Sequence, residues 1–236
     1  MMVKLGNFLF HYRNGLFPLA YAILLFDPSR MMNNDLVAAL IGFLVAMSGQ
    51  ALRAVTIGLV YIIRGGKNRQ VYAEALVTQG VFAHCRNPLY LGNLLILAGV
   101  AIAANSMLFL AIGLPLFLFI YLCIIAAEEN YLEGKFGQEF IEYCKRVNRF
   151  IPNLSGIRNT LEGTEFNWKR VVVKDYGTIF YWSAGIICIA GKNVWLHTGY
   201  DAGRQIFRTL GVLLVLLIFA YVTARYLKKS GKWVAD

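Results

Sequence analysis

The sequence predicts an all-α integral membrane protein with about six transmembrane helices and a cytoplasmic pocket, formed by the hairpin of the third and fourth spans and the amphipathic helix that follows them. Of its 236 residues, 58% are hydrophobic and only 15% are charged, and the mean hydropathy is +0.56. Soluble domains carry closer to a quarter of charged residues, so this composition is typical of a membrane protein. Apolar segments long enough to form helices and a one-sided distribution of Lys and Arg support the same class.

A helix that crosses the hydrocarbon core needs about 20 apolar residues. Six segments approach this length: residues 16–26 (with a possible backward extension over "LGNFLF"), 36–63, 89–104, 107–127, 176–190 and 206–226. The sequence "AANS" at 103–106 is typical of a tight turn, so the third and fourth segments are expected to form a helical hairpin. The N-terminus lacks the small-residue cleavage site of a signal peptide, so the first segment is expected to be retained.

The basic residues indicate the orientation of these segments. An even number of spans puts both termini on one side, together with most of the Lys and Arg residues. On that side lie Lys4, Arg13, Arg64, Lys67, Arg69, Arg86, the basic residues of 135–174, Lys228, Lys229 and Lys232. The opposite loops hold Arg30, Lys192 and Arg204, with Arg208 at a helix start. We therefore expect both termini to be cytoplasmic, in a bacterial-type inner membrane or one similar to the endoplasmic reticulum.

The formal net charge of +10 does not indicate nucleic-acid binding, because no recognition motif accompanies it. The four cysteines form no CxxC pair and the three histidines are scattered, so no metal site is predicted.

The chain is predicted to be one membrane domain over residues 1–236, with two polar cytoplasmic stretches. In the second stretch Phe136, Phe140, Tyr143 and Val147 recur at helical spacing, which predicts an amphipathic helix at the membrane surface. Residues 154–174 contain Ser, Gly, Asn and charged residues, and we interpret them as a linker with an interfacial tail. Residues 175–236 would then add a two-helix hairpin.

The stretch "HCRNPLY" at 84–90 begins the third span and is expected to lie beside "AAEENYLEGKFG", where the fourth span ends. Pro88 suits a first helical turn, and the free N–H groups there, with Arg86, favour an anion. Glu128 and Glu129 are expected to lie at a helix C-terminus, where the helix dipole disfavours acids. A ligand with both a carboxylate and a positive charge would fit such a site.

"GVFAHCRNPLYLGN" followed by "EENYLEGKFGQEFIEYCKRVNRFIP" closely resembles the paired motifs of integral-membrane methyltransferases. That superfamily includes isoprenylcysteine carboxyl methyltransferases and phospholipid N-methyltransferases. The resemblance covers residues 78–153. It implies S-adenosylmethionine (SAM) as methyl donor, S-adenosylhomocysteine as product, and a lipid-like or amphiphilic acceptor that enters from the bilayer.

The resemblance also implies a set of cofactor-binding residues. They are His84, Arg86, Asn87, Pro88, Tyr90, Gly92, Glu128, Glu129, Tyr143 and Arg149. Glu129 is the candidate for accepting a proton if the acceptor is an amine or a hydroxyl.

Two positions bear on the acceptor. The carboxyl methyltransferases carry an Arg five residues before the second glutamate, where this chain has Ile124. Arg53 lies within the second span, and charges at membrane depth usually face a protein interior or a wet cavity. Arg53 is therefore a second catalytic candidate, which would hold an acceptor headgroup; snorkelling or a structural ion pair is the alternative.

A methyltransferase for a phospholipid amine or another lipid-borne heteroatom is the preferred hypothesis. The alternatives are carboxyl methylation of a prenylated thiol, methylation of a small thiol, and a non-catalytic scaffold or transporter. The identity of the acceptor and the oligomeric state are left open by the sequence.

Overall fold

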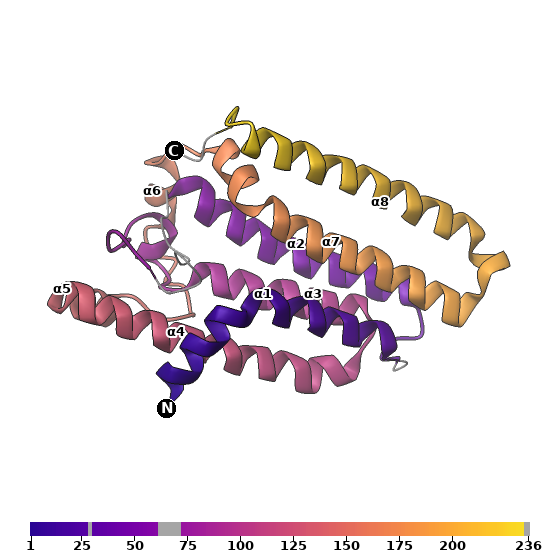
Figure 1. Cartoon of the computed structure of the whole chain (residues 1–236), viewed down its shortest axis with the longest axis horizontal. Helices are drawn as coiled ribbons and strands as arrows, with labels where there is room; N and C mark the ends of the chain where they lie inside the picture. Colours follow the sequence, from indigo (N-terminus) through magenta and orange to yellow (C-terminus); the bar gives the residue numbers. More distant parts are fainter. Residues whose placement is uncertain (28–29, 61–71, 234–236) are drawn as a thin grey trace.

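The computed structural model describes residues 1–27, 30–60 and 72–233, in which helices pack side by side (Figure 1). In chain order they are α1 (Met2–Phe26), α2 (Asp35–Leu59), the 3-10 helix η1 (Gly80–Ala83), α3 (Pro88–Ala103), the π-helix η2 (Phe109–Gly113), α4 (Leu114–Phe136), α5 (Gln138–Arg146), α6 (Ile157–Glu162), α7 (Trp168–Thr198) and α8 (Tyr200–Lys229). These described ranges contain no β-strand. The all-helical class is therefore confirmed.

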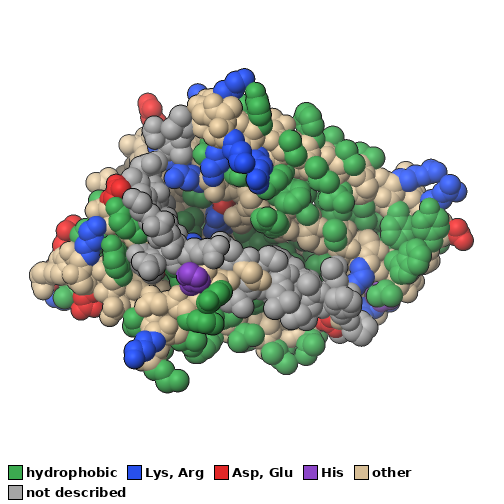
Figure 2. Space-filling view, in the orientation of Figure 1, with side chains coloured by type: hydrophobic (Ala, Val, Ile, Leu, Met, Phe, Trp, Pro, Cys, Tyr) green, Lys and Arg blue, Asp and Glu red, His purple; other side chains and the backbone are tan. Residues whose placement is uncertain are grey.

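Within the described residues, four helices are long and apolar enough to cross a membrane: Asp35–Leu59, Phe109–Phe136, Trp168–Thr198 and Tyr200–Lys229. Helix α3 is also apolar but has 16 residues, which span about 24 Å and fall short of a bilayer core of about 30 Å. The protein is therefore a multi-pass membrane protein, while the count of six spans stays a prediction. Both termini lie at the same end of the bundle (Figure 1), and hydrophobic side chains cover much of its middle (Figure 2).

The predicted boundaries of the fifth segment were wrong. Helix α7 extends from Trp168 to Thr198 rather than over 176–190, and α6 occupies part of the predicted linker 154–174. The side chain of Asn167 caps α7 by accepting a hydrogen bond from the backbone N–H of Arg170 (2.9 Å). The first turns of α7, "WKRVVVKD", combine exposed charged residues such as Lys169 with the buried Val171, Val173 and Asp175. A hydropathy pattern does not recognise such a mixture as part of a span. The end of the second predicted segment, 61–63, lies outside the described residues.

The turn between the third and fourth segments has the predicted position, but α3 packs mainly on α2. Glycines make this close approach possible: Gly42 and Gly49 of α2 face Gly99 and Gly92 of α3. A Cβ atom on Gly49 would lie 2.5 Å from the carbonyl oxygen of Gly92. Small residues at such positions let helix backbones approach closely, as is common in membranes. Helix α1 packs on α4, so α1 and α2 flank the predicted hairpin.

We expect Gly99→Ala to lower the stability of the protein by about 1–3 kcal/mol, because over-packing a tight contact forces backbones apart. The added Cβ atom would lie 2.4 Å from the backbone nitrogen of Ala46. Gly211→Ala in α8 is the matched control, since nothing lies within 4 Å of its added Cβ atom. Thermal unfolding in detergent measures both variants, and equal midpoints would contradict a close-packed α2–α3 contact.

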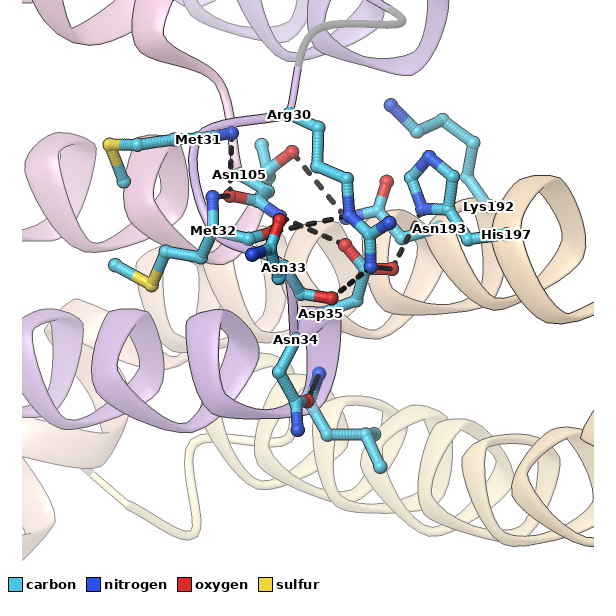
Figure 3. A network of polar contacts seen from close by, with 12 residues as sticks. Arg30, Met31, Met32, Asn33, Asn34, Asp35, Asn105, Lys192, Asn193 and His197 are labelled. Atoms are coloured by element: carbon cyan, nitrogen blue, oxygen red, sulfur yellow. Dashed lines mark hydrogen bonds and ion pairs between the residues drawn. The ribbon is translucent and has the colours of Figure 1, made fainter.

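A polar network closes the end of the bundle opposite to the termini (Figure 3). Asn105, in the α3–α4 turn, has a φ of 61°, a conformation that Asn tolerates better than most residues. Its side chain accepts from the N–H of Met32 (2.6 Å) and donates to Asp35 (2.9 Å). His197, at the end of α7, contacts the other oxygen of Asp35 (2.7 Å). The network joins the α1–α2 connection, the α3–α4 turn and α7.

Candidate functional site

A cavity of about 970 Å³ lies among α1, α2, α3, α4, α7 and α8. Figure 2 shows a hollow beside α7, with Lys and Arg side chains gathered at one edge. Its lining includes the polar residues Arg86, Asn87 and Glu128, further cations such as Arg53 and Lys174, and apolar residues such as Leu97 and Ile124. None of its lining residues belongs to α5. The prediction that the amphipathic helix forms part of the pocket wall was therefore wrong. Residues of α7 and α8 line the cavity instead.

The two motif segments are joined by backbone and side-chain hydrogen bonds. The N–H of Arg86 donates to the carbonyl of Asn148 (2.9 Å), and the side-chain amide of Asn87 donates to the carbonyl of Arg149 (3.2 Å). The hydroxyl of Tyr143 donates to the carbonyl of Phe82 (2.7 Å). These bonds hold the segment before α3 against the segment after α5.

His84 ties the same region together. Its ring Nδ1 lies 2.7 Å from the carbonyl oxygen of Asn153, which only accepts, so this nitrogen carries the proton. Its Nε2 then accepts from the hydroxyl of Thr160 in α6 (2.8 Å) when the ring is neutral. His84 is buried and does not line the cavity.

Asn87 is the N-cap residue of α3, and Pro88 begins the helix. The oxygen of the Asn87 side chain accepts no capping bond, and the nitrogen of the same side chain donates to the carbonyl of Arg149. The N–H groups of Leu89 and Tyr90 have no acceptor within the helix by their position in its first turn. Both residues line the cavity, so the positive end of the α3 dipole faces it.

The two adjacent glutamates lie within α4, which continues to Phe136, so the prediction that they lie at a helix C-terminus was wrong. Their side chains have different surroundings. Glu129 forms ion pairs with Arg149 (2.5 Å) and Arg86 (3.5 Å) and does not line the cavity. Glu128 lines the cavity, is 5% exposed, and accepts a hydrogen bond from the hydroxyl of Tyr90 (2.8 Å). The ring of Tyr90 packs against that of Tyr121, with centroids 5.2 Å apart.

Arg86, which lines the cavity, connects Glu129 to it. Its guanidinium also donates to the sulfur of Cys144 in α5. Partial burial raises the pKa of the Cys144 thiol, while the Arg86 charge acts in the opposite direction. The Nε–H of Arg86 is buried without a hydrogen-bond partner in the described part of the chain. A buried donor of this kind indicates a place for a ligand acceptor, because leaving it unpaired is unfavourable.

Arg53 lies on the cavity wall and forms a bidentate contact with Asp175 of α7, in which its Nε donates to Oδ2 (3.1 Å). A further guanidinium nitrogen donates to Asn93 of α3 (2.7 Å). Gln50 also donates to Asp175 (2.7 Å) and accepts from the indole N–H of Trp182 (3.0 Å). The pair is buried, with side-chain exposures of 11% for Arg53 and 0% for Asp175. Arg53 thus joins α2, α3 and α7, and its contact with an acceptor stays a prediction.

The structure separates the predicted cofactor residues into two groups. On the cavity wall lie Arg86, Asn87, Pro88, Tyr90 and Glu128. Behind the wall lie His84, Gly92, Glu129, Tyr143 and Arg149, of which Glu129 contacts Arg86 directly and Gly92 packs against Gly49.

Sequence reasoning missed the contribution of α7 and α8. Their lining residues are Lys174, Tyr176, Gly177, Thr178, Tyr181, Trp182, Ala184, Gly185, Cys188, Ile189 and Lys228. Asp175, which directly precedes the predicted span 176–190, was the available signal, since an acid beside a membrane span calls for a cation such as Arg53.

Apolar helices around a cavity with converging polar groups define a multi-pass membrane protein with a site in the size range of small-molecule pockets. The model of the phospholipid methyltransferase family matches residues 36–139, which include α2, α3, the glutamate pair and the start of α5. The chain belongs to the integral-membrane methyltransferase superfamily.

Two curated proteins are similar to the chain. The cobalt-zinc-cadmium resistance protein CzcN of Cupriavidus metallidurans is 34% identical over 158 residues, which cover 64% of this chain and 68% of that protein. The nickel-cobalt-cadmium resistance protein NccN of Alcaligenes xylosoxydans xylosoxydans is 34% identical over 84 residues, or 36% of this chain and 39% of that protein. No solved structure matches the chain significantly.

Proposed function

We propose that the protein is a SAM-dependent methyltransferase that acts on a lipid-like or amphiphilic acceptor in the membrane. The observation that carries this proposal is the meeting of both motif segments at one wall of the cavity. Arg86 and the N-terminus of α3 come from the first segment, and Glu128 and Glu129 come from the second. Membership of the methyltransferase superfamily supports the same activity.

The residues present fit the cofactor. The unpartnered Nε–H of Arg86 and the first-turn amides of α3 suit a carboxylate. The carboxylate of Glu128 suits an ammonium group, a hydroxyl group or a positive sulfonium. Arg149 and Glu129 would hold Arg86 in place from behind. When bound, SAM would supply a methyl group activated by its positive sulfonium, with S-adenosylhomocysteine as the leaving group.

The chain's own contribution is positioning and charge. Proximity and alignment supply most of what a displacement of this kind needs. The geometry favours Glu128 for holding or accepting an acceptor proton, because it lines the cavity and Tyr90 fixes one of its oxygens. The sequence suggests Glu129 for this role, but the structure pairs Glu129 with Arg86 and Arg149. The single variants Glu128→Gln and Glu129→Gln distinguish the two assignments.

Carboxyl methylation of a prenylated thiol is the second candidate for the reaction. Ile124, where the carboxyl methyltransferases carry an Arg, is buried and lines the cavity, so this position offers no cation to a carboxylate. This apolar wall supports a lipid chain there rather than a charged group.

The names of the two relatives associate those proteins with metal resistance, and we propose modification of membrane lipid as an activity compatible with that setting. Cytoplasmic termini remain part of this proposal.

Calorimetric titration of SAM into the detergent-solubilised protein tests the proposal. We expect saturable binding, and a loss of affinity of about 10- to 100-fold in the double variant Glu129→Gln, Asn87→Ala, because charged hydrogen bonds are lost. The matched control is Glu133→Gln, one helical turn further along α4 and exposed to solvent. Absence of binding to the intact, folded protein would overturn the proposal. Equal losses in the control would place the cofactor elsewhere.

A further inference from the structure

We infer that Asn93 and Thr178 donate hydrogen bonds to a neutral oxygen of the methyl acceptor, and that Arg53 is the positioning residue that orients them. This assignment rests on the proposed function and names further binding residues in the same cavity. Arg53 comes from α2, Asn93 from α3 and Thr178 from α7, and all three line the cavity. Arg53 would therefore act on the acceptor through its two neighbours rather than by direct contact.

The N–H groups of Arg53 are all engaged by the protein. An arginine side chain has five N–H donors and no acceptor. Its Nε and one terminal nitrogen donate to the two oxygens of Asp175. The terminal nitrogens also contact Oδ1 of Asn93 (2.7 Å), the carbonyl oxygen of Leu89 (3.4 Å) and the hydroxyl oxygen of Thr178 (3.5 Å). Because these contacts use all five donors, a ligand that bound Arg53 would have to displace one of them.

The contact with Arg53 fixes the orientation of the Asn93 amide. Because a guanidinium only donates, the amide atom that contacts it must be the oxygen and not the nitrogen. The two N–H groups then lie on the other side of the amide carbon, and they have no acceptor among the residues that the structure describes. Asn93 is half-buried and lines the cavity, so both donors are available to a ligand.

Thr178 presents a second donor on the opposite side of Arg53. A threonine within a helix commonly donates to the carbonyl four residues earlier, as Thr56 does to Leu52 (2.7 Å). The Thr178 hydroxyl makes no such bond within the described part of the chain. Its oxygen contacts a nitrogen of Arg53 that can only donate, so the hydroxyl proton remains for another acceptor.

The charge between these two donors is already balanced. Asp175 is fully buried and pairs with Arg53 through both of its oxygens. A cation would meet only donors at this place, and an anion would meet a guanidinium whose charge Asp175 offsets. A neutral oxygen, such as that of a carbonyl or an ether, satisfies the donors without bringing a second charge into an apolar environment.

The position of the two donors favours the acceptor over the cofactor. The proposed cofactor contacts of Arg86, Glu128 and the first turn of α3 all lie within residues 36–139, which match the family model. Thr178 lies outside this range, on α7. Asn93 follows Tyr90 by one helical turn and lies further along α3 from its N-terminus. Because SAM is the common donor and acceptors differ, a contact from α7 is expected to serve the acceptor.

Near-isosteric variants separate donation to a ligand from a structural role. Asn93→Asp keeps an oxygen for Arg53 but removes both N–H donors, and Thr178→Val keeps the side-chain shape but removes the hydroxyl. The probes are 2-tridecanone, which has one neutral oxygen, and tridecane, which has none. Both are titrated into the full chain in maltoside detergent by calorimetry, so the natural acceptor need not be known.

We expect the unchanged protein to bind 2-tridecanone more tightly than tridecane. Each variant should lower the affinity for the ketone by about 3- to 10-fold, the effect of losing one hydrogen bond between uncharged groups. The affinities for tridecane and for SAM should stay within about twofold. Thr178→Ser keeps a hydroxyl and should recover most of the loss seen in Thr178→Val. Ser183→Ala, on α7 but not on the cavity wall, is the matched control.

Arg53→Lys tests the positioning role. Lysine keeps the positive charge, but its single nitrogen cannot hold Asp175, Asn93 and Thr178 together. We expect a selective loss of ketone affinity, whereas a purely structural role would lower the affinities for ketone and alkane equally. Thermal unfolding in detergent should show unchanged midpoints for Asn93→Asp and Thr178→Val, which separates their effect from loss of the fold.

Three results would overturn this assignment: equal affinities of the unchanged protein for ketone and alkane, equal losses in Thr178→Val and Ser183→Ala, or a fall in SAM affinity that matches the fall in ketone affinity. The last result would place the cofactor at these donors. If SAM binds and the ketone is not preferred, the assignment fails and the proposed function stands. If the ketone is preferred but SAM does not bind, the proposed function fails and the two donors remain a site for a neutral oxygen.

Discussion

Asp175→Ala is expected to lower the free energy of unfolding by about 3–5 kcal/mol, because it leaves the buried guanidinium of Arg53 without its carboxylate. Asp175 is fully buried and accepts hydrogen bonds from both Arg53 and Gln50. Its removal would therefore disconnect α7 from α2. The loss is measured as a fall in the thermal unfolding midpoint of the detergent-solubilised protein.

Two control variants test whether this loss comes from the buried ion pair. Glu162→Ala breaks the exposed ion pair with Arg158 and should change stability little, since solvent already screens that pair. Adding Arg53→Met to Asp175→Ala removes the uncompensated charge and should recover part of the loss. An unchanged midpoint in Asp175→Ala would contradict a role of the ion pair in holding α7.

The second large effect is expected on catalysis. If the acceptor must lose a proton, Glu128→Gln should lower the rate of methyl transfer by about 10²- to 10⁴-fold and leave SAM affinity within about threefold. Glu128 faces the cavity and accepts from Tyr90, whereas Glu129 pairs with Arg86 and Arg149. Glu129→Gln should therefore lower the affinity for SAM more than it lowers the rate of methyl transfer in the complex with SAM.

Single-turnover transfer of a labelled methyl group to organic-soluble material from the expression host's membranes measures the rate, and calorimetry measures the affinity. Tyr90→Phe keeps the ring against Tyr121 but removes the hydroxyl that fixes Glu128, so a smaller loss of rate is expected. If Glu128→Gln transfers normally while Glu129→Gln binds SAM and fails to transfer, the proton acceptor is Glu129.

Much of the fold follows from the sequence because a bilayer leaves few alternatives. Apolar segments in lipid must satisfy their backbone groups internally, so hydropathy alone predicts helices. The tight turn around Asn105 and the start of α3 at Pro88 followed from local residues in the same way. The boundaries of α7 did not, because its first turns mix charged and apolar residues, and packing against neighbouring helices decides which of them are buried.

The candidate site was predicted in part. The contact between Tyr90 and Glu128 and the contact of Arg86 with Glu129 agree with the expectation that the two motifs meet. The different surroundings of Glu128 and Glu129 were not predictable, since adjacent helical residues point in directions about 100° apart and only packing decides which one faces a cavity.

The sequence by itself determined an all-helical membrane protein of the methyltransferase superfamily, with its two motif segments placed at neighbouring helix ends. Local composition and order suffice for this, because helix formation in lipid and the motif are both properties of contiguous residues. The tertiary structure alone decided that α3 packs on α2, that Asp175 of α7 pairs with Arg53, and that Lys174 and Lys228 border the same cavity as Glu128. These contacts join residues far apart in the chain, and they depend on which helix faces fit together, which the order of residues within one helix does not specify.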